Sequence, residues 1–213
     1  EIGQNIPVLS VLRGLSAPVK LYIDRESEEL AALARFDDDG VNRWDAMQAL
    51  YVRAIKNRLP GNEWNPVELI ATVRGLIESE TSIQDEACLA EMLTLPQSNV
   101  LWDEFQPADP QAIACARNEV MADLGKGLFT QWEVLFSKMQ ILEEYQPISS
   151  QIGKRSLGLC ALGYLANASN QDHLLETIFH TANNLTQRVA AYRIARQEGS
   201  SDLSNALSEA FLQ

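Results

Sequence analysis

The side chains best suited to metal chemistry are His173, Glu176 and His180, and the sequence contains no other histidine. Spacings of three and four residues place all three on one face of a helix, and imidazole and carboxylate groups are ligands of zinc. That face lies opposite the apolar positions of the same segment, so it points toward solvent or a cavity. We therefore interpret it as a polar outer face and predict no metal ligand in this chain.

The segment Gly153-Lys154-Arg155-Ser156 resembles the end of a phosphate-binding P-loop. The first glycine of that motif is missing, because Ile148 occupies its position, and no buried strand precedes it. Lys154 and Arg155 at a helix start oppose the helix dipole, so an acidic partner is expected nearby. We interpret the segment as the start of a helix and not as a phosphate site.

The remaining motifs give no catalytic assignment. The loop 37–40 (Asp-Asp-Asp-Gly) has too few ligands for calcium, and no Glu follows at the required distance. G-x-S-x-G, H-E-x-x-H and a Cys/His pairing are absent from the sequence. No pair of carboxylates lies in apolar surroundings that would shift its pKa. The sequence predicts no catalytic and no metal-binding residue, and it leaves the substrate-binding residues unassigned.

Composition is that of an ordinary globular protein with an acidic balance. The 213 residues are 46% hydrophobic and 22% charged, with a formal net charge of −12. Without a basic patch, nucleic acid and anionic membranes are excluded as expected partners. Three scattered cysteines (Cys88, Cys115 and Cys160) lie in apolar helical runs. An odd number at such positions predicts buried free thiols and a reducing, cytoplasmic location.

The clearest structural pattern lies between Ser169 and Gln197. Apolar residues with a helical period occupy 174–182 and again 185–195, and only Asn183 and Asn184 separate the two runs. Asparagine can close one helix and cap the next, and Gln187 three residues later completes a capping box. This predicts a helical hairpin that needs stacked neighbours to bury its apolar stripes.

Similar helical patterns follow one another from Asp24 to the end of the chain. Helices are expected over 26–36, 41–59, 66–77, 85–95, 110–124, 128–144, 150–168, 169–182, 184–197 and 201–211, with residues 97–108 as an irregular connection that can hold one turn around Leu101-Trp102. About 20 residues per helix and about 40 per pair is the range of HEAT-like arrays. The predicted fold class is mainly α, an α-α superhelix of stacked antiparallel helix pairs (HEAT/ARM-like), formed by residues 24–213.

Residues 1–23 differ in composition from the rest. β-branched and other strand-compatible residues alternate there with Pro7, Gly14 and Pro18, which predicts two short strands with a turn at Arg13-Gly14. Two strands alone are marginally stable. We therefore expect residues 1–23 to be the end of an upstream β-domain, and the absence of an initial methionine predicts excision from a longer protein.

Five blocks, in this order, resemble the C-terminal region of the bacterial aminopeptidase N family, the alanyl aminopeptidases among the gluzincin zinc peptidases. They are Leu12–Leu21 (LRGLSAPVKL), Asn42–Ala46 (NRWDA), Leu93–Pro96 (LTLP), Lys154–Leu157 (KRSL) and Ala182–Thr186 (ANNLT). The similarity extends over essentially the whole chain with similar spacing throughout. Its specificity lies in the joint order of the blocks.

The resemblance implies that catalysis and access to the active site belong to different domains of a larger enzyme. In that family an upstream domain binds zinc through H-E-x-x-H and a distant Glu, the Glu inside the motif acts as general base, and a G-A-M-E-N segment holds the peptide amino terminus. The helical domain covers that site and encloses a chamber for short peptides. The chain lacks the peptidase motifs, and its helical part stops earlier than the family's.

Two functions are therefore compared. The first is a non-catalytic helical domain of a zinc-dependent aminopeptidase, with zinc, catalytic residues and the β-domain upstream in the same polypeptide and with peptides as substrates. The alternative is an autonomous HEAT-like scaffold that binds a protein partner on its concave face. A zinc-peptidase motif upstream of Glu1 would favour the enzyme, and a start codon near Glu1 would favour the scaffold.

Overall fold

The computed structural model describes residues 8–15, 19, 23–79, 85–107 and 109–211. Within these ranges the chain forms eleven α-helices and one short 3-10 helix. Their bounds are η1 Arg13–Leu15, α1 Ser27–Phe36, α2 Gly40–Arg58, α3 Val67–Glu78, α5 Glu86–Leu93, α6 Ser98–Glu104, α7 Pro110–Gly127, α8 Phe129–Lys138, α9 Ser149–Ala168, α10 Asp172–Thr181, α11 Leu185–Glu198 and α12 Ser201–Phe211. The predicted α-helical stack is confirmed.

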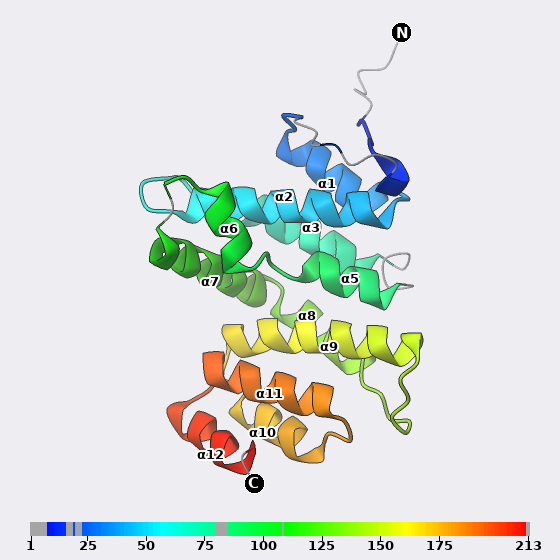
Figure 1. Ribbon diagram of the computed structural model, residues 1–213, viewed down its shortest axis with the longest axis vertical. Helices are drawn as coiled ribbons and strands as arrows, with labels where there is room; N and C mark the ends of the chain where they lie inside the picture. Colours follow the sequence, from blue (N-terminus) through cyan, green and yellow to red (C-terminus); the bar gives the residue numbers. More distant parts are fainter. Residues whose placement is uncertain (1–7, 16–18, 20–22, 80–84, 108, 212–213) are drawn as a thin grey trace.

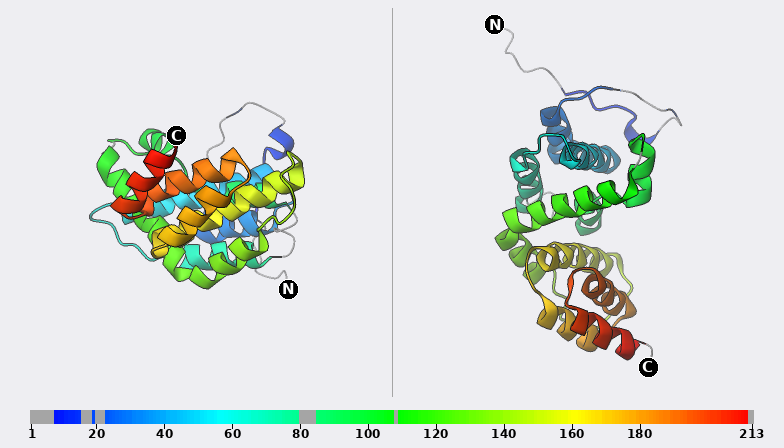
Figure 2. Two further views of the ribbon diagram at one scale, coloured as in Figure 1. Left: turned by 90° about the horizontal axis from the view of Figure 1, so that it is seen from below. Right: turned by 90° about the vertical axis from the view of Figure 1, so that its left-hand side faces the viewer.

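The helices are stacked along the long axis of the molecule, from α1 near one end to α12 at the other (Figure 1). One row consists of α2, α5, α9 and α11, and each of these helices contacts the next. A second row lies behind it, where α8 packs on α9 and α10 packs on α11 (Figures 1 and 2). The row of α2, α5, α9 and α11 forms the face seen in Figure 1, which we call the front face.

Helix α9 joins the two halves of the stack. Two of its side chains, Leu157 and Tyr164, belong to the apolar cluster that also takes in α1 to α8, while Leu162 belongs to the cluster formed with α10, α11 and α12. The ring of Trp132 stacks on Tyr164 with centroids 4.2 Å apart, and the Tyr164 hydroxyl donates to the Leu93 carbonyl at 2.7 Å. The apolar character of this segment fits its contacts with both clusters, although its Ile152 side chain is 47% exposed.

The predicted N-terminal strands are wrong for the part of the segment that the structure describes. Residues 8–12 contain no strand, and Arg13–Leu15 form the 3-10 helix η1. Leu12 and Gly14 have φ of 54° and 68°, which no extended strand permits. The Val11 carbonyl accepts a hydrogen bond from the Asn42 side chain, so a helix uses the group that a strand partner would need. Residues 1–7, 16–18 and 20–22 of that prediction lie outside the described residues.

Two further predictions differ from the structure. Residues 98–104 form helix α6, where the sequence predicts an irregular connection with at most one turn around Leu101-Trp102. Helix α8 ends at Lys138, six residues before the expected Glu144, and Leu142 in the following loop is 94% exposed. Neither difference changes the order of the stack.

The interface of α7 with α9 gives a stability prediction. A Cβ on Gly125 would lie 2.7 Å from the backbone carbonyl of Tyr164, whereas one on Gly163 would meet only the Met121 Cε at 3.6 Å. We expect Gly125→Ala to lower the free energy of unfolding by about 1–3 kcal/mol through overpacking. Gly163→Ala should leave it unchanged or raise it by up to about 1 kcal/mol, because alanine loses less backbone entropy in a helix.

Urea unfolding followed by circular dichroism compares the two variants directly. Equal effects at the two positions would contradict the observed close approach of α7 to α9.

Candidate functional site

A large hollow lies on the front face, between α2 and the α5–α6 segment. It has a volume of about 910 Å³ and is open on one side. Helix α2 provides one wall, from Trp44 to Asn57, and the residues from Glu91 to Glu104 provide the other. We call it the Trp44 groove.

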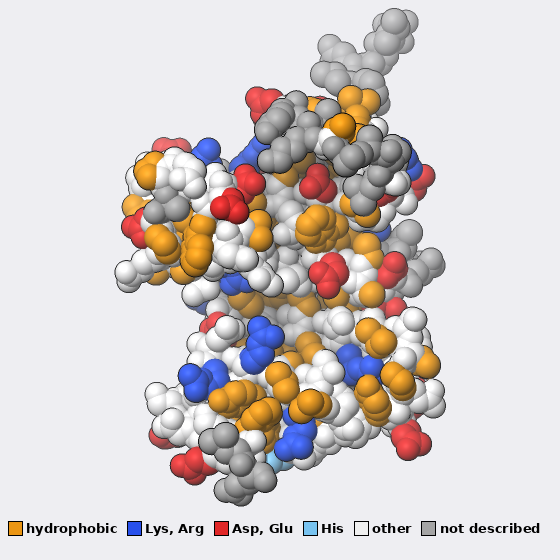
Figure 3. All heavy atoms as spheres, viewed as in Figure 1, with side chains coloured by type: hydrophobic (Ala, Val, Ile, Leu, Met, Phe, Trp, Pro, Cys, Tyr) orange, Lys and Arg blue, Asp and Glu red, His pale blue; other side chains and the backbone are white. Residues whose placement is uncertain are grey.

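An exposed tryptophan and unpaired carboxylates distinguish this groove. Trp44 is 41% exposed and also lines two adjoining hollows of about 590 and 620 Å³. The carboxylates of Asp45, Glu91 and Glu104 line the groove, and none of them makes a hydrogen bond or ion pair with another described residue. Figure 3 shows acidic side chains prevailing over the end of the front face that holds α2, α5 and α6, and basic side chains over α9 and α11.

The sequence gives no signal for this site. Trp44 lies at helical spacing from Met47, Leu50 and Tyr51, and the structure buries those three but not Trp44. Helical spacing alone does not distinguish Trp44 from these three residues, because the exposure of a side chain depends on which helices pack against its turn.

The acidic loop 37–40 binds the N-terminal segment to the start of α2. We call this set of contacts, made by Arg13 and Gly14 with residues 37–39, the Arg13 joint. Arg13 forms ion pairs with Asp37 and Asp38, and the Gly14 amide donates to the Asp39 carboxylate at 2.9 Å. Asp39 also caps α2 by accepting from the amides of residues 41 and 42. These carboxylates are therefore occupied by local protein groups, in contrast to those of the Trp44 groove.

Hydrogen bonding lowers the pKa of two carboxyl groups in this joint. The Gly14 amide, followed by those of the α2 N-terminus, lowers the pKa of Asp39. Burial works to raise the pKa of Asp37, but the hydroxyl of Ser10, the Asp39 amide and the charge of Arg13 outweigh it and lower the pKa. Both groups therefore favour the charged form.

The histidine-containing face of α10 does not form a metal site. His173, Glu176 and His180 are all exposed, as the sequence predicts. The His180 ring packs edge-on against Phe179. Across the described ranges, no group of three or more His, Cys, Asp or Glu side chains is arranged to hold a metal ion, so these residues do not fit zinc.

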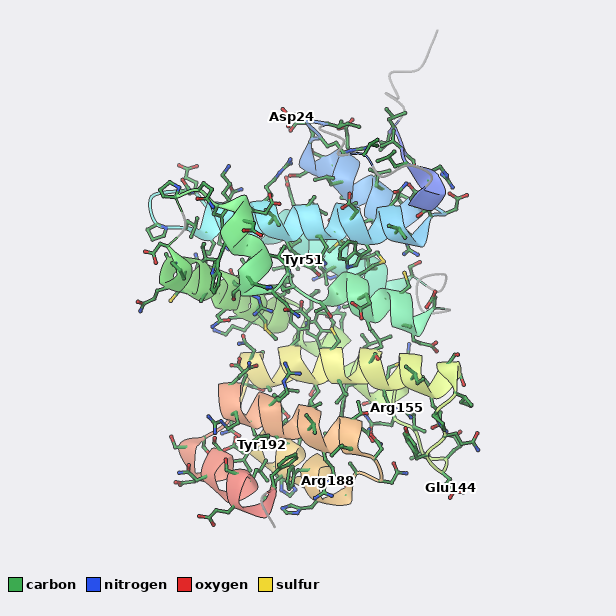
Figure 4. All side chains as sticks on the ribbon, viewed as in Figure 1. Asp24, Tyr51, Glu144, Arg155, Arg188 and Tyr192 are labelled. Carbon is green, nitrogen blue, oxygen red and sulfur yellow. The ribbon has the colours of Figure 1, made fainter. Side chains whose placement is uncertain are left out.

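The P-loop-like segment lies inside helix α9, where its backbone amides belong to the helix. Arg155 is 7% exposed, hydrogen-bonded to the Gln151 side chain at 3.1 Å, and stacked over the Tyr145 ring at 4.8 Å. Figure 4 places Arg155 near the start of α9, beside the loop that carries Glu144. The expected acidic partner is thus wrong for Arg155, whose charge is met by an amide and an aromatic face.

The three cysteines are free thiols, and their surroundings differ. Cys115 is exposed, so the prediction that all three are buried is wrong for this residue. Burial raises the pKa of the Cys160 thiol to about 12 and also raises that of Cys88. A raised pKa keeps a thiol protonated and unreactive.

Taken together, the structure defines a helical-repeat domain with an acidic groove and no metal-binding cluster among its described residues. A family model described as a domain of unknown function (DUF3458_C) with ARM repeats matches residues 27–213. The chain belongs to this family. No helix in the described part of the chain is both long and apolar enough to cross a membrane.

The similar proteins are aminopeptidases. The chain is 30% identical over 199 residues to aminopeptidase N of Haemophilus influenzae, covering 91% of this chain, and 32% identical over 196 residues to that of Escherichia coli, covering 89%. The chain spans only 22% of the length of each of these relatives. The crystal structure of Legionella pneumophila aminopeptidase A in complex with aspartic acid shares the fold, with a TM-score of 0.81 and 24% identity over 98% of this chain and 26% of that one.

The Arg13 joint gives a prediction for pH. In a carbon-13 NMR titration, the carboxyl groups of Asp37, Asp39 and Asp172 should have midpoints below 3.8. A lowered folded-state pKa stabilises the fold above the unfolded pKa and loses that contribution as the pH falls through the folded value. The joint should therefore contribute its full stabilisation well above pH 3.8 and lose it progressively as the pH falls through the lowered folded-state midpoints.

The variant Arg13→Ala tests the cause. It should raise the midpoint of Asp37 and leave Asp172 unchanged, because hydrogen bonds from Ser200 lower the pKa of Asp172. An unchanged midpoint for Asp37 would contradict the assigned role of Arg13.

Proposed function

We propose that the chain is the non-catalytic helical domain of a zinc-dependent aminopeptidase, an enzyme that removes amino-terminal residues from peptides. In this proposal the helical stack, residues 24–213, covers an active site held elsewhere in the same polypeptide and shapes the peptide chamber. Residues 1–23 belong to the preceding β-domain. The parent enzyme acts in the cytoplasm, and its zinc and general base lie upstream of this chain.

The observation that carries this proposal comes from the alignment with aminopeptidase N, which covers nearly all of this chain but only a small part of each relative. About nine-tenths of the chain aligns with aminopeptidase N, yet the matched part is 22% of those proteins. The sequence has only two histidines and no H-E-x-x-H. A domain of this kind contributes shape and access, since zinc peptidases need that motif to hold the metal and its general base.

The autonomous scaffold gains no separate support. Its distinguishing feature would be a partner-binding face, and a groove on an enzyme domain serves equally well for substrate. The aminopeptidase alignment covers the helical stack itself, so the stack need not be explained as an independent module.

The proposal predicts a sharp difference between the segment and its parent. The purified chain should hold no stoichiometric zinc and should not hydrolyse an alanyl arylamide. The full polypeptide that contains it should bind zinc and hydrolyse the arylamide, and a chelator should abolish this hydrolysis. Metal content by mass spectrometry and release of the arylamine measure these outcomes, and robust turnover by the segment alone would refute the proposal.

A further inference from the structure

The carboxylates beside Trp44 form no ion pair with a cation in the part of the chain that the structure describes. Asp45 and Trp44 both line the groove and the adjoining hollow of about 590 Å³. Glu91 and Trp44 both line the groove and the adjoining hollow of about 620 Å³. Both side chains are exposed, and neither forms an ion pair with a described residue. The indole and the two carboxylates therefore form one surface that is apolar, aromatic and negative.

The cations that line the groove do not neutralise this surface. Arg53 donates to the Ser27 hydroxyl at 2.8 Å and to the Arg25 carbonyl, which commits its guanidinium to the segment before α1. Lys56 lies eleven residues after Asp45 on α2, about 16 Å along the helix axis. The groove is thus negative at the Trp44 end and carries a separate positive charge toward the other end.

A positively charged side chain on an extended peptide is complementary to these features. A cation is attracted to the face of an indole, and most strongly where carboxylates flank it. About five residues of extended chain span 16 Å at about 3.3 Å per residue. The exposed side chains of Gln97 and Asn57 offer hydrogen-bonding groups along this length.

We propose that the Trp44 groove binds a lysine or arginine side chain of the peptide substrate, at a position downstream of the residue that is removed. This rests on the proposed function, because the peptide must reach the helical domain while its amino terminus is at the active site. Asp45 and Glu91 would pair with the cation and Trp44 would cover it. The groove then gives the enzyme a preference for peptides with a basic residue beyond the cleavage position.

The test uses the full polypeptide that contains this chain. The substrates are hexapeptides that begin with alanine and carry one lysine at position two, three, four, five or six, each matched by a peptide with norleucine in its place. We expect at least one position at which kcat/KM favours lysine by about fivefold, the size given by exposed ion pairs and a cation–π contact. The preference should weaken at high salt, since exposed charges are screened.

Two charge-matched variants assign the preference to the groove. The double variant Asp45→Asn/Glu91→Gln should bring the lysine-to-norleucine ratio close to one. The control Glu176→Gln/Asp202→Asn removes the same charge from α10 and α12, at the other end of the stack, and should keep the ratio (Figure 1). Hydrolysis of alanyl arylamide, which has no downstream residue, should be the same in all three proteins and reports correct folding.

The outcomes separate this inference from the proposed function. Absence of arylamide hydrolysis by the native full polypeptide refutes the proposed function. Arylamide hydrolysis with a ratio of one at every position, or with an equal loss of preference in both variants, overturns the groove assignment alone. A change of oligomeric state confined to Asp45→Asn/Glu91→Gln would instead identify a second copy as the occupant, which also overturns it.

Discussion

Burial of α9 is the interaction on which the rest of the structure depends. This helix packs against α5, α7 and α8 on one side and against α11 on the other, and it places side chains in both apolar clusters. The stack of Trp132 on Tyr164 and the hydrogen bond from Tyr164 to Leu93 fix α5 and α8 relative to it. Large buried aromatic rings such as these two contribute a major part of the hydrophobic free energy of a core. Without α9 the two halves of the stack would have no common core.

The shape of the Trp44 groove follows from the same packing. Helix α5 is held against α9, and α2 is held against α7, which itself contacts α9. The separation between the two walls of the groove is therefore set by buried contacts, together with a hydrogen bond across the groove from the Gln48 side-chain amide to the Thr94 carbonyl at 3.1 Å. Unpaired carboxylates can remain on this exposed surface at little cost in folding free energy, because water solvates them.

The polar groups of this region divide into two kinds. The carboxylates of the Arg13 joint and the guanidinium of Arg53 are bonded to nearby backbone and side-chain groups, and they connect the N-terminal segment to α1 and α2. Asp45, Glu91 and Glu104 have no such partners among the described residues. The first kind explains local structure, and the second kind carries the proposal that the groove binds a basic side chain of the peptide.

The sequence predicts features that depend on local pattern, and it fails where tertiary contacts decide. The cap of α11 by Asn184 is confirmed, with its side chain accepting from the Gln187 amide, because a capping box is a local signal. Helix α6 was predicted as one turn at most, because seven residues with one buried leucine are too few to show a period. The predicted strand failed at Leu12, whose positive φ no propensity indicates.

The groove itself had no signal in the sequence. Its walls come from segments more than thirty residues apart, and only their packing brings Asp45 beside Glu91. The resemblance to aminopeptidases predicted the family of the helical domain, but it could not indicate which face carries unpaired charges. That face emerges from the exposed fractions and the unpaired carboxylates.

The central claim is that this stack covers chemistry located elsewhere in the same polypeptide. An experimental structure of the full polypeptide with its metal would test it most directly. The account predicts zinc held by residues upstream of Glu1, with the front face of α2, α5, α9 and α11 turned toward it across a chamber. Zinc bound by His173 and His180, or a helical stack that lies away from the zinc and leaves it open, would contradict the account.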